Sequence, residues 1–189
     1  MKVPGRRAKL VELAGWVSTA LARRGIRAVL VGGAAVSVHT ANRYLSLDVD
    51  LATVADGREL AEVMLGLGFT RTGRVWQHPR FTPTLDFVPG PPAVGNAILN
   101  RFMTVRTRYG PVTVVTPTQA SMDRLAAFYH WNDRQGLEQA LQIARNSRID
   151  MPAIARWSAS EGMTARFEEF RRALLIDSRA RPRTARKHR

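Results

Sequence analysis

The spacing of apolar residues predicts helices at both ends of this 189-residue chain, with short strands between them. Near the start of the chain, apolar side chains recur three or four positions apart, which is the spacing of one buried helix face. We therefore predict a helix from about Arg6 to Arg24, ended by Gly25. A second helix is expected to open at Asp56-Gly57 and to close at Gly68.

Short apolar runs bounded by Gly, Pro and polar residues are typical of buried strands. A short helix of small residues, from Ala34 to about Thr40, is expected after the first such run. The stretch Pro89–Gly95, rich in Pro and Gly, is expected to break regular structure. The predicted strands are Ala28–Val31, Asp48–Val54, Arg74–Gln77, Thr84–Val88 and Val112–Val115.

After residue 115 the pattern becomes helical, because apolar residues return to helical spacing and acceptable cap residues precede each run. One of these starts, Asp150-Met151-Pro152, has the form of an N-cap with proline in the first turn. The predicted helices run from an N-cap at Thr118 to about Trp131, from Asn132 or Asp133 to Arg145, from Asp150 onward, and over Arg166–Leu175. We expect a core over residues 1–115, a helical part over 116–178 and a disordered basic tail over 179–189.

The charge balance indicates a polyanionic partner. The net charge is +14 at pH 7, and nearly all of the positive charge is arginine, with Lys2, Lys9 and Lys187 the only lysines. Arginine forks match phosphates in a bidentate geometry that lysine cannot reach. RNA is the partner that this charge favours, and a surface that only resists aggregation is the alternative.

The composition also excludes several classes of site. The chain has no cysteine, so disulfides, thiolate metal sites and cysteine nucleophiles are excluded. The four histidines lack the spacing of a zinc site. No apolar run reaches the roughly 18 residues of a membrane span, and the first 25 residues lack a signal-peptide core. We therefore expect a soluble, cytoplasmic protein with no membrane partner.

The candidate chemistry lies between Val29 and Ala52. Gly32-Gly33 follows an apolar run, and adjacent glycines let backbone N–H groups approach an anion closely. Asp48 and Asp50 alternate on a predicted strand, so both carboxylates project from the same face. Two such carboxylates coexist most easily around a divalent cation, and Mg²⁺ commonly takes one or two carboxylates together with substrate phosphates. This pattern indicates phosphoryl or nucleotidyl transfer.

Gly32-Gly33 followed by Asp48-Val49-Asp50 resembles the signature of the DNA polymerase β-type nucleotidyltransferase superfamily. The segment from Arg43 to Asp50 resembles the R-x-x-S-x-D-x-D form of the AbiEii-type nucleotidyltransferase toxins of toxin–antitoxin systems. The resemblance covers most of Ala28 to Ile143. It implies an α/β fold, in which a polymerase β-like core of a mixed sheet with flanking helices is followed by a helical C-terminal part.

The resemblance also implies an active site. The third carboxylate of the superfamily matches Asp86, within the apolar run Thr84–Val88. Two Mg²⁺ ions, or Mn²⁺ in their place, would be held by Asp48, Asp50 and Asp86, and Asp86 could also act as a base. The residues expected to bind the nucleoside triphosphate are Gly32, Gly33, Ser46, Arg43 and Arg124.

Two residues of the predicted helical part carry a departure from the family pattern. Arg124 stands where the family has a lysine, and arginine holds phosphate but is a poor proton carrier. Asp133 matches a later family aspartate, which would make it catalytic, although a helix N-cap explains it equally well.

The resemblance and the charge together predict transfer of a nucleotide from a nucleoside triphosphate to RNA, most simply to a tRNA 3′ end. The protein would then be a toxin with a cognate antitoxin. Three alternatives remain: modification of a protein hydroxyl, modification of a small molecule, and a non-catalytic RNA-binding domain. Each residue also has a simpler interpretation. The diglycine could be a plain turn, Asp48 and Asp50 solvated carboxylates, and Asp86 a turn residue.

Overall fold

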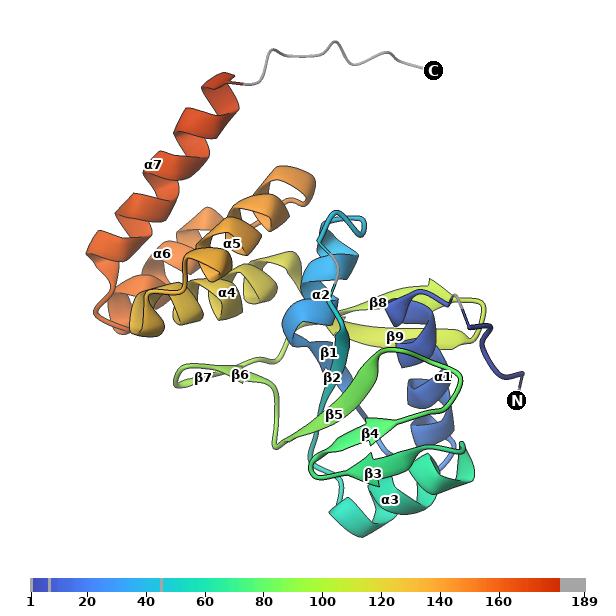
Figure 1. The fold of residues 1–189 in the computed structure, drawn as a ribbon. Coiled ribbons are helices and arrows are strands. Elements are labelled where there is room, and N and C mark those ends of the chain that lie inside the picture. Colours follow the sequence, from blue (N-terminus) through green and yellow to red (C-terminus); the bar gives the residue numbers. More distant parts are fainter. Residues whose placement is uncertain (1, 7, 45, 181–189) are drawn as a thin grey trace.

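The computed structural model describes residues 2–6, 8–44 and 46–180, and it shows a mixed sheet with helices on its sides and a group of helices at the C-terminal end (Figure 1). The predicted α/β fold class is confirmed. The helices are α1 (Leu10–Ala22), α2 (Gly32–His39), α3 (Gly57–Gly66), α4 (Pro117–Trp131), α5 (Arg134–Asn146), α6 (Met151–Ser160) and α7 (Thr164–Ala180). The strands are β1 (Val29–Val31), β2 (Asp48–Thr53), β3 (Thr70–Thr72), β4 (Val75–Gln77), β5 (Thr84–Pro89), β6 (Ala93–Val94), β7 (Ala97–Ile98), β8 (Phe102–Thr107) and β9 (Gly110–Val115).

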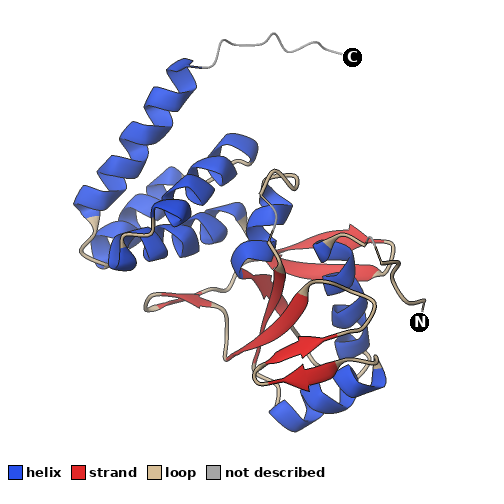
Figure 2. Cartoon of the chain, in the orientation of Figure 1, coloured by secondary structure: helices blue, strands red, loops and turns tan. Residues whose placement is uncertain are grey.

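The main sheet has seven strands in the order β3-β4-β5-β2-β1-β9-β8, and β6 and β7 form a separate hairpin (Figure 2). The central strands mix both directions. β1 pairs with β2 antiparallel and with β9 parallel, whereas β2 pairs with β5 parallel. Leu30 of β1, Leu51 of β2 and Val114 of β9 are fully buried, so the core lies at the centre of the sheet.

The helix α2 contacts both parts of the molecule. It packs on β1 and β2 and on the C-terminal helices α4 and α5 (Figure 1). The aromatic residues Phe128 and Phe170 are fully buried among those C-terminal helices. Because α2 contacts both groups of elements, the domain division at residue 115 stays a prediction, although β9 does end there.

Several predicted boundaries need correction. The first helix begins at Leu10 rather than Arg6, because the Glu12 carboxylate accepts a hydrogen bond from the Lys9 backbone N–H at 2.9 Å and caps it there. The predicted N-cap at Thr118 is wrong. Thr116 caps α4, since its hydroxyl accepts from the Gln119 N–H at 3.3 Å and the Gln119 side chain accepts from the Thr116 N–H at 2.8 Å.

Other elements were absent from the prediction or differ from it in length. β3, β7 and β8 were not predicted, and β6 lies inside the stretch that was expected to be irregular. The helix α2 begins at Gly32, two residues earlier than expected. The predicted tail begins too early, because α7 continues to Ala180, and residues 181–189 lie outside the described residues.

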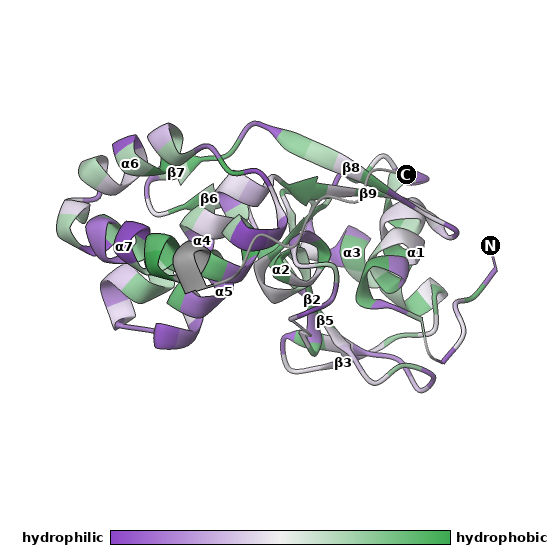
Figure 3. Ribbon diagram, turned by 90° about the horizontal axis from the view of Figure 1, so that it is seen from above, coloured by the Kyte–Doolittle hydropathy of each residue, from purple (hydrophilic) through white to green (hydrophobic). Residues whose placement is uncertain are grey.

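The ribbon of α7 alternates between hydrophilic and hydrophobic residues, as expected for a helix with one packed side (Figure 3). The side chains of Phe167 and Phe170 are buried, whereas those of Leu175 and Ile176 are exposed. Over the part of the chain that the structure describes, no helix combines the length and apolar character needed to cross a lipid bilayer.

Candidate active site

The structure brings the three predicted aspartates to one region of the sheet. Asp50 of β2 lies in register with Asp86 of the parallel strand β5, and Asp48 lies in register with Thr84. Residues in register on neighbouring strands share a face, and residues two apart on one strand do as well. The three carboxylates therefore project from the same face of the sheet. Asp48 is exposed, Asp50 half-buried and Asp86 buried.

The electrostatics of this face favour a cation. Burial raises the pKa of Asp50 above its ordinary value, and the negative charges of Asp48 and Asp86 raise it further. The nearby guanidinium of Arg124 acts in the opposite direction but does not cancel these effects. The half-buried carboxylate thus lacks sufficient positive charge around it in the protein alone. Carboxylate oxygens are hard ligands of the kind that Mg²⁺ and Mn²⁺ prefer, so the donor set fits such an ion.

The carboxylates are not drawn together into a ready-made metal cage. Among the described residues, no three His, Cys, Asp or Glu side chains converge closely enough to ligate one ion. Two polar neighbours hold the carboxylates instead. The Thr84 hydroxyl donates to Asp48 Oδ1, and Arg74 donates to Asp86 Oδ2 from Nε at 3.0 Å and from Nη2 at 2.6 Å.

The predicted glycine turn lies directly against these side chains. Gly32 has a φ of +60°, and a Cβ added there would lie 2.5 Å from Asp50 Oδ2. A Cβ on Gly33 would lie 2.7 Å from the Ser46 hydroxyl oxygen. A side chain at either position would therefore displace Asp50 or Ser46, and at Gly32 it would also strain the left-handed backbone conformation. The diglycine turn thus lies in direct contact with the segment that carries the two aspartates.

Ser46 orders the chain that leads into β2. Its hydroxyl donates to the Asp48 carbonyl at 3.1 Å, and its backbone N–H donates to the Ser37 hydroxyl at 3.1 Å. The Ser37 hydroxyl in turn donates to the Gly33 carbonyl at 3.2 Å. These bonds link the glycine turn to the segment that carries Asp48. Arg43 is exposed after α2, so its role in triphosphate binding stays a prediction.

Arg124 reaches the site from α4. Its guanidinium forms an ion pair with Asp123 and donates to Gln139 Oε1 at 3.3 Å. Its charge also lowers the pKa of Asp50, which shows that it lies within electrostatic reach of the carboxylates. The role of Arg124 in binding the triphosphate stays a prediction.

Asp133 is the N-cap of α5, where its carboxylate accepts from the Gln135 N–H at 2.9 Å. Asp133 is therefore a helix cap, as one of its two interpretations predicted. Its catalytic role stays a prediction.

Sequence reasoning missed three polar residues of the site. Asp123 is the first of them, and it lines a small cavity with Gly32 and Gln119. The other two, Thr84 and Arg74, hold Asp48 and Asp86. A signal existed for Thr84, because it stands two positions before Asp86 on the same strand face, as Asp48 does before Asp50. Nothing in the local sequence pattern pointed to Arg74.

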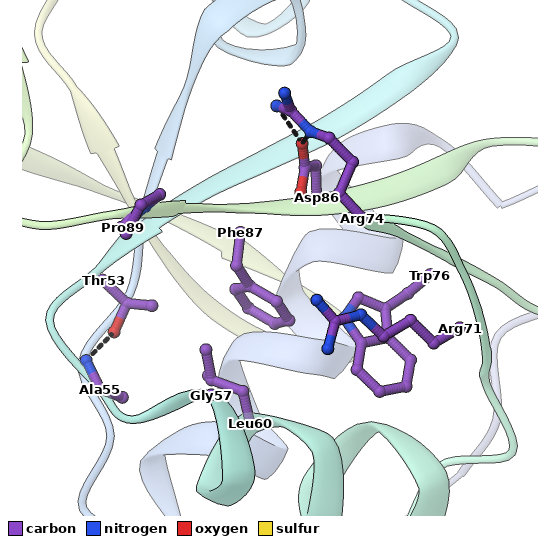
Figure 4. A pocket seen from close by; sticks show the side chains of 10 residues that line it. All are labelled: Thr53, Ala55, Gly57, Leu60, Arg71, Arg74, Trp76, Asp86, Phe87 and Pro89. Carbon is purple, nitrogen blue, oxygen red and sulfur yellow. Dashed lines mark hydrogen bonds and ion pairs between the residues drawn. The ribbon is translucent and has the colours of Figure 1, made fainter.

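A pocket of about 440 Å³ opens on the other side of β5 (Figure 4). Figure 4 shows the side chains of Asp86 and Arg74 on one side of the strand and that of Phe87 on the other side, facing Leu60 of α3. The Arg71 guanidinium lies over the Trp76 ring there, 5.8 Å from its centroid. The pocket therefore extends away from the carboxylates, although Arg74 and Asp86 form part of its wall.

The comparisons with known proteins identify the fold. No family model matches the chain, and no curated protein matches its sequence. Among solved structures, an antigenic nucleotidyltransferase-like protein from Paracoccidioides brasiliensis is similar with a TM-score of 0.58 and 12% identity, over 88% of this chain and 95% of that one. This likeness shows that the fold is that of a nucleotidyltransferase-like protein.

Two structures of the antibiotic-resistance factor ANT(2'')-Ia are also similar. Its solution structure has a TM-score of 0.48 and 15% identity, over 91% of this chain and 97% of that one. Its crystal structure with adenylyl-2''-tobramycin has a TM-score of 0.47 and 14% identity, over 87% and 97% of the two chains. At these TM-scores the two structures add nothing to the fold assignment.

Proposed function

We propose that the protein is a metal-dependent nucleotidyltransferase, which transfers a nucleotide from a nucleoside triphosphate to a hydroxyl group. The observation that carries this proposal is the register of Asp50 with Asp86, on neighbouring strands, beside a glycine turn where an added Cβ at Gly32 would lie 2.5 Å from Asp50 Oδ2. Burial and the charges of Asp48 and Asp86 raise the pKa of the half-buried Asp50, so its ionised form needs added positive charge of the kind that a bound metal supplies.

Asp48, Asp50 and Asp86 are the residues that would hold Mg²⁺, or Mn²⁺ in its place, as two ions. Bound there, the metal lowers the pKa of the attacking hydroxyl and neutralises charge on the transferred phosphate. Asp86 is also the residue that we propose as the base for the proton of that hydroxyl. Arg124 of α4, whose charge reaches Asp50, would offset the negative charge of the triphosphate. Gly32, Gly33 and Ser46, which lie beside the carboxylates, are the residues that would contact the triphosphate.

The decisive experiment for the chemistry incubates the purified protein with Mg²⁺, each labelled nucleoside triphosphate in turn, and total RNA. We expect one triphosphate to label RNA, and Asp50→Asn and Asp48→Asn to abolish the transfer. Glu59→Gln is a matched control, because it removes an exposed carboxylate from α3 and should keep full activity. Full transfer by the Asp50 variant would overturn the metal assignment.

The proposed acceptor is RNA, most simply the 3′ end of a tRNA. The support for it is the net charge of +14 and the dominance of arginine, which binds phosphate in bidentate form. Binding of RNA should weaken with salt, with a log–log slope of about −0.7 for each phosphate contact to a single strand. Truncation after Ala180 removes Arg181, Arg183, Arg186, Lys187 and Arg189 and keeps α7 intact. We expect the truncated protein to bind RNA more weakly and with a shallower slope.

An acceptor of another class gives a different result. The label would then appear on a small molecule or on a protein, and the transfer rate would change neither with salt nor with the truncation. That result would exclude RNA as the acceptor and leave the proposed nucleotidyl transfer in place. Binding of RNA without any transfer would support the non-catalytic alternative.

The biological role we propose is that of a toxin, neutralised by a cognate antitoxin protein. This role rests on the R-x-x-S-x-D-x-D pattern between Arg43 and Asp50. Expression of the protein in a bacterial host should arrest growth, and expression of Asp50→Asn should not. Sequencing of tRNA 3′ ends from the arrested cells should show added nucleotides. Equal growth of the two strains would overturn the toxin role and leave the enzymatic proposal in place.

A further inference from the structure

The turn between β3 and β4 places an arginine on the carboxylate cluster. Arg74 follows Gly73 in this turn, and its Nε and Nη2 groups both donate to a single oxygen, Oδ2 of Asp86, at 3.0 and 2.6 Å. The two partners differ sharply in exposure. The Asp86 side chain is 12% exposed, and the Arg74 side chain is 84% exposed. The arginine therefore reaches inward from the surface to a buried acceptor.

This pairing has two physical consequences. Asp86 lies in register with Asp50, so without a nearby cation the two carboxylates would repel each other. The bonded guanidinium supplies that cation. Because most of the Arg74 side chain is in solvent, its head group can leave Asp86 without opening a cavity in the core.

From this geometry we infer that Arg74 is a positioning residue, a resident counter-cation that holds Asp86 in place and that the metal must displace to bind. The inference rests on the proposed metal site. The forked guanidinium occupies one of the two oxygens of Asp86, Oδ2, and leaves only Oδ1 for a metal, so arginine and metal compete for one carboxylate. The exchange gives Asp86 a cationic partner both before and after the metal binds.

The hairpin offers a matched control in Arg71. Arg71 lies on the same hairpin and is also exposed, but its Nε donates to the Gly73 carbonyl at 3.0 Å and its guanidinium packs over Trp76. Figure 4 shows the two arginines on opposite sides of β5. Arg71→Ala and Arg74→Ala remove the same charge from the protein, and only the second removes the bonds to Asp86.

The test is a titration of the purified full chain with Mn²⁺ alone, followed by electron paramagnetic resonance of the free ion. We expect Arg74→Ala to bind Mn²⁺ about two- to fivefold more tightly than the wild type, the size of the exchange for a partly exposed ion pair. Arg71→Ala should match the wild type. Arg74→Gln keeps hydrogen-bond donors but not the charge, and it should also bind more tightly.

A second readout separates this role from a structural one. Without metal, Arg74→Ala should melt at a lower temperature than the wild type because Asp86 loses its partner, and saturating Mg²⁺ should raise its melting temperature more than that of the wild type. Unchanged or weaker Mn²⁺ binding by both Arg74 variants, with Asp50→Asn abolishing binding, would overturn the inference and leave the proposed function intact. Absence of Mn²⁺ binding by the wild type would overturn both.

Discussion

Replacing Gly32 by alanine tests how closely the glycine turn approaches the Asp50 carboxylate. The residue has a φ of +60°, a conformation in which a side chain costs about 1–2 kcal/mol. The added Cβ would also lie 2.5 Å from Asp50 Oδ2 and 3.3 Å from its Cγ, so the carboxylate must rotate away. Forcing a side chain off its rotamer costs about a further 1 kcal/mol. We expect Gly32→Ala to lose about 2–3 kcal/mol of unfolding free energy in total.

Gly25→Ala provides the control for the backbone contribution. Gly25 has a φ of +73°, and an added Cβ would meet no atom within 4 Å. That variant should therefore lose only the backbone cost, about 1–2 kcal/mol. The difference between the two variants, measured by urea denaturation followed by circular dichroism, isolates the contact with Asp50. Nucleotidyl transfer should fall by about a hundredfold in Gly32→Ala, because a displaced ligand misplaces the reacting groups, and it should be unchanged in Gly25→Ala.

A double variant makes the reasoning refutable. Asp50→Ala removes the carboxylate that the new Cβ would strike, so Gly32→Ala should cost less in that background than in the wild type. Equal costs in both backgrounds would show that the two residues do not touch. A Gly32→Ala variant that is as stable as Gly25→Ala and fully active would refute the close approach of turn and carboxylate.

Three further predictions concern other residues. Asp86→Asn should retain triphosphate binding but lose at least about two decades of transfer rate; joint loss of binding and structure would make Asp86 structural. His39 is buried, its Nε2 donates to the Val115 carbonyl at 2.8 Å, and burial lowers its pKa from 6.5. The unfolded chain therefore binds the proton more readily, so stability should fall as the pH drops below about 6.5. Melting temperatures at about pH 8 and about pH 5.5 should differ less in His39→Gln, and an equal difference would contradict this. Asp133→Ala should cost about 1 kcal/mol through loss of the α5 cap, whereas Asp133→Asn should keep both cap and activity. Loss of transfer in Asp133→Asn would instead assign the catalytic role.

The sequence predicted the parts of the site that lie within a short stretch of chain. Strand alternation placed Asp48 and Asp50 on one face, and the diglycine marked the turn. The apolar run around Asp86 identified β5, but only the register shows that Asp86 lies beside Asp50. Register between strands joined by a long connection depends on the packing of the whole sheet, so no local pattern encodes it.

The errors at element ends have a similar cause. Thr116 and Thr118 are both suitable caps by residue type, and the reciprocal bonds with Gln119 select Thr116. β8 was missed because most of its residues are exposed at the edge of the sheet, so it carries no buried-face alternation to detect. Arg74 was missed because an arginine in a surface turn is ordinarily solvated. Only the folded structure shows that it reaches Asp86 on a buried strand.

The parallel pairing of β1 with β9 also determines when the site can form during synthesis. Val29 of β1 lies opposite Thr113 of β9, so β1 cannot form this pair until a residue 84 positions later (113 − 29) has been synthesised. The antiparallel pair of β1 and β2 is available far earlier, and it already carries the glycine turn and two of the carboxylates. A long closure of this kind slows folding, because the entropy of the loop is lost before the contact forms. A nascent chain that ends before β9 therefore exposes β1 as an unpaired edge and lacks Arg124, so interrupted translation yields an aggregation-prone fragment with an incomplete site.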